Sequence, residues 1–175
     1  MTLDELKSVV APWRDLSFSA VGVTLRDRIN PPMDPHDDYR VIHEVLIEPA
    51  ALDKMRMEIW LTASGHVAVG METRDRVAQR LGSRTLRKGF AAGHEPTVVS
   101  PQALAKLIQA VSQGRLAIGV SSLLGFIYST KGILAQADLH DLKRAGYDCE
   151  DWTSRMVGLH SFFEQVVRYR SWTGT

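Results

Sequence analysis

The sequence contains a single cysteine and no marked excess of either charge. Because Cys149 has no partner in the chain, an intramolecular disulfide is excluded, and with it the small disulfide-stabilised scaffold. The 175 residues carry 21 Lys plus Arg and 20 Asp plus Glu, a formal net charge of +1. This balance excludes a generally basic nucleic-acid coat protein and a highly charged disordered tail. With 45% hydrophobic and 23% charged residues, the composition is that of an ordinary globular protein.

A long hydrophobic run is also missing. The uncharged stretch 116–130 is shorter than the roughly 20 apolar residues that a membrane helix needs, and it contains glycine and serine. We therefore expect no membrane association. The first six residues, Met1–Leu6, include two acids and no basic segment, which argues against a signal peptide. With the lone cysteine, this predicts a cytoplasmic protein.

Strong catalytic and metal-binding motifs are absent as well. No two histidines have the His-x-x-x-His spacing of a zinc site, and His94-Glu95 is followed by the helix breaker Pro96. Neither the Walker A pattern nor Gly-x-Gly-x-x-Gly occurs. The stretch Gly119–Leu123 lacks the closing glycine of a nucleophile elbow. We predict no bound metal and no cofactor, and we expect a protein other than an enzyme.

The N-terminal half has the patterns of β-structure after one short helix. Thr2 and Glu5 form a capping-box pattern for a helix over 2–10. Alternating apolar residues predict strands over 16–25 and 39–48. A hairpin is predicted over 57–73, with a two-residue loop at Ser64-Gly65 that would pair Leu61 with Ala68.

The second half has mostly helical patterns. Helices are predicted over 74–81, 100–112, 120–128, 138–146 and 148–172. Gly82 is expected to end the first of these, and Ser100 followed by Pro101 marks the start of the second. The fold class is therefore α+β: an antiparallel sheet of about four strands in the N-terminal half, packed by helices mostly from the C-terminal half. We expect one domain over 1–175, with a division into subdomains near 82–93 as the alternative.

A basic cluster lies within 15 residues of the sequence. It contains six cations and one acid, Asp75, so its net charge is +5 and that of the remaining chain is −4. Such a cluster could bind phosphates, RNA or an acidic protein surface. The alternative is a solvated face paired with acids elsewhere. The cations are Arg74, Arg76, Arg80, Arg84, Arg87 and Lys88.

Apolar and aromatic residues supply further candidate contacts. Ile42 and Leu46 share the mixed face of the strand over 39–48, and Tyr169 and Trp172 lie near the C-terminus beside arginines. Tyrosine, tryptophan and arginine are enriched in interface hot spots. The apolar seam predicted on the helix 148–172 could also form a homodimer. The alternative is that all of these residues pack inside the same domain.

These observations favour a non-enzymatic module that binds a protein partner, as an adaptor, a chaperone-like protein or an inhibitor. One alternative is a small-molecule binder or enzyme with a site on the sheet, for which His43, His66 and Glu72 are the candidates. The other alternative is nucleic-acid or phosphate binding through the basic cluster. We expect nucleic acid not to be the partner, because the segment carries only one aromatic residue, Phe90, beyond its basic residues.

Overall fold

The computed structural model describes residues 1–14, 21–27, 40–147, 152–153 and 164–173. Their helices and strands alternate along the chain, in the order α1 (Leu3–Arg14), β1 (Val21–Asp27), β2 (Val41–Pro49), β3 (Met57–Thr62), β4 (Val67–Thr73), α2 (Arg74–Leu81), β5 (Arg84–Thr85), β6 (Phe90–Thr97), α3 (Pro101–Ser112), β7 (Ala117–Leu123), β8 (Phe126–Ile133), α4 (Gln136–Arg144), β9 (Trp152–Thr153) and β10 (Glu164–Arg168).

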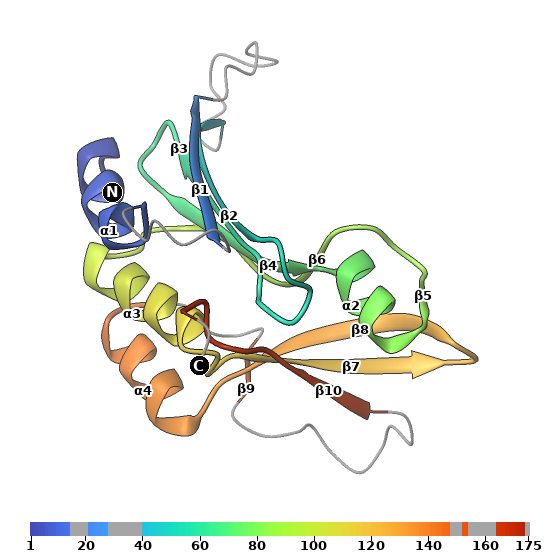
Figure 1. The fold of residues 1–175 in the computed structure, drawn as a ribbon. Helices are drawn as coiled ribbons and strands as arrows, with labels where there is room; N and C mark the ends of the chain where they lie inside the picture. The colour runs from blue at the N-terminus through green and yellow to red at the C-terminus, as the bar shows by residue number, and fades with distance from the viewer. Residues whose placement is uncertain (15–20, 28–39, 148–151, 154–163, 174–175) are drawn as a thin grey trace.

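The strands form two sheets. The first has the order β1-β2-β3-β4-β6, with every neighbouring pair antiparallel. The second has the order β10-β7-β8-β5, with β9 pairing the other end of β8. Helices α1, α3 and α4 stack along one side of the molecule, and α2 lies on the opposite side between the two sheets (Figure 1). The α+β class is confirmed.

The strand count and the distribution of helices differ from our prediction. The first sheet has five strands and the second sheet comes mostly from the second half of the chain, while two of the four helices described lie before residue 82. The segment 120–128, predicted as a helix, forms part of the β7–β8 hairpin. The predicted helix 148–172 is also wrong where the structure describes it, because 152–153 and 164–168 are strands; Met156, Leu159 and Phe163 of the seam lie outside the described residues.

Several local predictions are confirmed. The Thr2 backbone N–H donates to Glu5 and the Glu5 N–H donates to Thr2 Oγ1, the reciprocal pattern of a capping box. Helix α2 ends at Gly82 in the left-handed conformation, and the Ser100 side chain caps α3. Helix α1 runs to Arg14, beyond the predicted end at residue 10, with Pro12 inside it.

The β3–β4 hairpin exists, but its predicted register is wrong. In the observed register Leu61 pairs with Val67 and Trp60 with Ala68, which leaves five residues, 62–66, beyond the last pair. The Thr62 side chain accepts from the His66 N–H, and this bond holds the wider loop closed.

One hydrophobic core joins both halves of the chain. It combines Ile47 and Ile59 of the first sheet, Leu107 of α3, Ile127 of β8 and Trp172 at the C-terminus. Within the described ranges, no helix is long and apolar enough to cross a bilayer, and no group of three or more His, Cys, Asp or Glu residues is arranged to hold a metal ion. The division into domains stays a prediction.

Candidate functional site

The basic cluster divides into two parts in the structure. Arg76 and Arg80 lie on α2 and are partly buried, whereas Arg84, Arg87 and Lys88 follow the helix and are exposed. Arg74, at the start of α2, is partly buried. The six cations therefore do not form one continuous anion-binding face.

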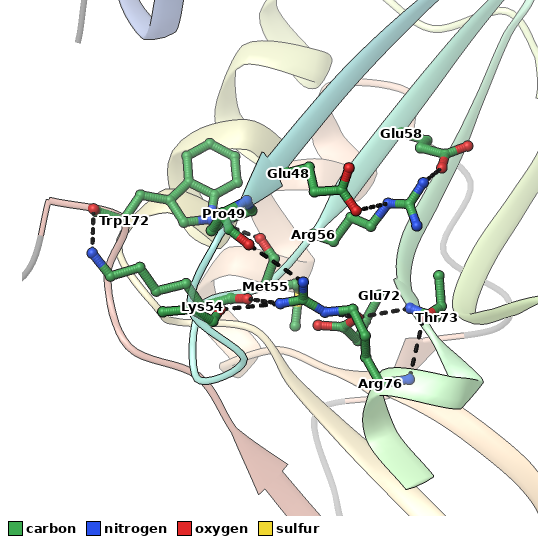
Figure 2. A network of polar contacts seen from close by, with 11 residues as sticks. Glu48, Pro49, Lys54, Met55, Arg56, Glu58, Glu72, Thr73, Arg76 and Trp172 are labelled. Atoms are coloured by element: carbon green, nitrogen blue, oxygen red, sulfur yellow. Dashed lines mark hydrogen bonds and ion pairs between the residues drawn. The ribbon is translucent and has the colours of Figure 1, made fainter. Parts of the chain in front are cut away.

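Arg76 is the centre of a buried polar network (Figure 2). Its guanidinium forms an ion pair with Glu72, with Nε 2.9 Å from Oε1, and donates to the backbone carbonyls of Pro49, Ala51 and Lys54. These three carbonyls belong to the end of β2 and the loop before β3. Arg76 thus fastens that loop to α2.

Glu72 has an unusual environment for a carboxylate. Its side chain is fully buried, its φ of 51° lies in the left-handed region, and its Oε2 has no hydrogen-bond partner. Burial raises the pKa of the Glu72 carboxyl above its usual value, against the opposing effects of the Thr73 N–H and Arg76. A strained residue with a perturbed pKa is often functional. Because Glu72 has no exposed surface, we assign it a structural role as the ion-pair partner of Arg76.

The same network includes the C-terminal segment. The Arg80 guanidinium lies 4.6 Å from the centre of the Tyr169 ring and donates to the Arg168 carbonyl. Trp172 donates its indole N–H to the Met55 carbonyl at 2.9 Å, and Lys54 donates to the Trp172 carbonyl. Burial and the Glu72 carboxylate raise the pKa of the Tyr169 hydroxyl well above its usual range.

The apolar residues proposed as contacts are mostly internal. Trp172 is 2% exposed, Tyr169 6% and Leu46 8%, so these three side chains pack within the chain's own core rather than offering an open surface. Ile42 is partly buried on β2, beside the register shift between Val41 and His43. Arg80 and Tyr169 are brought together, whereas Ile42 and Leu46 belong to the other sheet.

The structure places His43, His66 and Glu72, the candidate residues of the enzyme alternative, in different surroundings. The His66 ring contacts the Ser64 hydroxyl within the β3–β4 loop, whereas Glu72 is buried at the far end of β4. His43 lies on β2, partly buried. Within the described part of the chain, three surface cavities are lined by other residues than His43, His66 and Glu72.

An exposed apolar patch stands out at the end of the β7–β8 hairpin. Leu124 is 89% exposed and Leu86 63%, and Leu123 and Tyr128 are about half exposed. Together they line a shallow hollow of about 360 Å³. We call this surface the hairpin-tip patch; its residues are Leu86, Leu123, Leu124, Phe126 and Tyr128.

The hairpin tip has a costly backbone conformation. Leu123 pairs with Phe126, so the loop has two residues, Leu124 and Gly125, and both have positive φ, at 51° and 78°. Positive φ at both positions is the requirement of a type I′ turn, which favours Asn-Gly or Gly-Gly. A leucine here costs about 1 kcal/mol or more of backbone energy. The turn therefore holds a large apolar side chain in solvent at the expense of local stability.

Three exposed cations flank the hairpin-tip patch. Strand β5 runs beside the tip, with the Arg84 N–H donating to the Gly125 carbonyl at 2.8 Å and the Leu86 N–H donating to Ile127. Arg84, Arg87 and Lys88 therefore stand next to the apolar side chains. Neither 82–90 nor 121–131 contains an acidic residue.

The sequence interpretation missed all five patch residues. Four of them lie in 120–128, which it assigned to a helix. The apolar spacing of Val120, Leu123, Leu124 and Ile127 fits a helical period by coincidence. The run Phe126-Ile127-Tyr128 directly after a glycine was the available signal, since aromatic and β-branched residues favour strands. Comparisons of the chain with protein-family models, curated protein sequences and solved structures found no match.

Proposed function

We propose that this protein is a binding module for a protein partner, with the hairpin-tip patch as the contact surface and Arg84, Arg87 and Lys88 on its rim. The observation that carries the proposal is Leu124, an 89% exposed leucine in a turn position that favours asparagine or glycine. A residue that costs stability and buries nothing is explained if it contacts something outside the chain.

The shape of the patch favours a protein over a membrane. The five side chains line a shallow, open hollow, which can receive an apolar side chain from a partner. The three cations predict acidic residues around that side chain. We therefore expect a partner surface with a protruding leucine, phenylalanine or methionine and an acidic rim.

Site-specific photo-crosslinking tests the proposal. A photoreactive phenylalanine analogue placed at Leu124 should crosslink one protein from the native host, and the same analogue at Val98 should not. Val98 is the matched control, since it is 68% exposed and lies outside the patch. The captured protein should lose binding to L124N, and its affinity should fall as the salt concentration rises.

Three results would contradict the proposal. One is equal crosslinking from both positions. Another is a concentration-dependent dimer, measured by sedimentation, that L124N abolishes, because the occupant would then be a second copy of this chain. The third is co-sedimentation with anionic vesicles that depends on Leu124, which would identify a lipid surface instead.

A further inference from the structure

A separate cavity lies where the two sheets approach each other. It measures about 310 Å³ and is lined by Arg74, residues 90–93 of β6, and Ser129, Thr130 and Lys131 of β8. Strand β6 is the last strand of the first sheet, and these β8 residues lie between the two-residue pairings with β5 and β9. The volume is at the lower end of the range for small-molecule sites.

The polar lining of this β6–β8 cavity is entirely suited to an anion. It offers the Arg74 guanidinium, the Lys131 ammonium and the Ser129 hydroxyl, with no carboxylate among the lining residues. In the part of the chain that the structure describes, neither Arg74 nor Lys131 forms an ion pair. Among the described residues, no ion pair offsets these two charges, and they give the cavity a positive potential.

Two buried polar atoms belong to residues of the same cavity. Arg74 Nε and Thr130 Oγ1 have almost no contact with solvent and no hydrogen-bond partner. Because a water-sized probe reaches neither atom, a ligand in the cavity cannot bond to them. An oxyanion there would instead be held by the outer part of the Arg74 guanidinium and by the Lys131 ammonium, through charge-assisted hydrogen bonds.

The remaining wall of the cavity is apolar and fixed. The Phe90 ring makes an edge contact with Trp60 at 4.9 Å between centroids and lies directly over Gly70, where an added Cβ would fall 2.7 Å from the ring. Gly93 continues this wall, and a Cβ there would have only ordinary contacts. The carbon part of a ligand can therefore pack against Phe90 without displacing it.

We infer that the β6–β8 cavity binds a small phosphate monoester. The phosphoryl group would lie between Arg74 and Lys131, and the organic part would pack on Phe90. This inference does not depend on the hairpin-tip patch, because no residue is shared between the two sites. The same chemistry could come from a free phosphorylated metabolite or from a phosphate of nucleic acid.

Titration of the purified protein with three probes distinguishes these sources. Inorganic phosphate, phenyl phosphate and a single-stranded oligonucleotide without terminal phosphate are compared by calorimetry. We expect saturable binding of phenyl phosphate, tighter than that of inorganic phosphate because of Phe90, and weak binding of the oligonucleotide. R74Q and K131Q should each weaken phenyl phosphate binding by about tenfold or more.

Two further variants keep the inference falsifiable. S129A removes the hydroxyl from the lining and should weaken binding by a few fold, while K143Q removes an exposed charge from α4, outside the cavity, and should change nothing. Equal binding by R74Q, K131Q and the unmodified protein would overturn the inference. So would the absence of saturation at millimolar phenyl phosphate, or oligonucleotide binding that phenyl phosphate does not displace.

Discussion

The two parts of the basic cluster contain the same residue types and have opposite roles. On α2, Arg76 and Arg80 bind carbonyls, a carboxylate and an aromatic ring of their own chain. After α2, Arg84, Arg87 and Lys88 extend into solvent beside an apolar surface. The lesson is that local net charge does not identify a binding surface, because packing decides which charges remain available.

Among these residues, Arg76 should cause the largest loss of stability when it is replaced. R76M leaves the buried Glu72 carboxylate without its ion-pair partner and frees three carbonyls, so we expect a loss of about 3–5 kcal/mol of unfolding free energy. Urea denaturation measures it. The double variant E72Q/R76M should recover part of that loss, because no buried charge is left unpaired. A loss below 1 kcal/mol for R76M would contradict the structural role.

The pH dependence of stability should change when Glu72 is made neutral. The pKa of the Glu72 carboxyl is higher in the folded protein than in the unfolded chain, so protonation of Glu72 stabilises the folded state. This stabilisation is complete below the unfolded pKa of about 4.5, and it is lost as the pH rises through the raised folded pKa. E72Q should therefore gain stability relative to the unmodified protein as the pH rises across that window. Parallel curves for the two proteins, measured by urea denaturation from pH 4 to 8, would show that Glu72 titrates normally.

Substituting Arg80 should have an intermediate effect. R80Q removes the contact with the Tyr169 ring and the bond to the Arg168 carbonyl, with an expected loss of about 1–2 kcal/mol. Thermal unfolding followed by circular dichroism measures the change. Tyr169→Leu is made both in the unmodified protein and in the R80Q background. The difference between its two effects is the contribution of the ring contact, because that contact is already absent in R80Q.

At the hairpin tip, the stability effect should have the opposite sign. Asparagine tolerates positive φ better than leucine, so L124N should raise the unfolding free energy by about 0.5–1 kcal/mol while it abolishes partner binding. A gain of stability together with a loss of binding is the result expected if Leu124 contacts the partner and does not support the fold. If L124N is destabilising, Leu124 supports the fold and the proposed function loses its main observation.

The exposed cations should contribute least to stability. The triple variant R84Q/R87Q/K88Q should unfold within about 0.5 kcal/mol of the unmodified protein. Its association with the partner should be slower and less sensitive to salt, as measured by stopped-flow or surface plasmon resonance. A stability loss as large as that of R80Q would remove the distinction between the two parts of the cluster.

Local signals in the sequence determined a substantial part of this fold. The structure confirms four local predictions: the capping box at Thr2 and Glu5, the Ser100-Pro101 helix start, the Gly82 helix end, and the strand predicted over 39–48, which is found as β2 over 41–49. Burial along β2 does not alternate, because residues 44–47 are all buried. The α+β class follows from the same patterns. Such signals are reliable because backbone geometry and capping act over a few residues.

Only the tertiary structure decided which of the candidate residues face outward. Whether 120–128 is a helix or a hairpin depends on pairing with β10 and β5, which are distant in sequence. Whether Arg76 binds a ligand or Glu72, and whether Trp172 is surface or core, depends on contacts with the loop before β3. The sequence supplied the charges and the apolar side chains, and long-range packing, which no local pattern encodes, selected the few that remain free to bind.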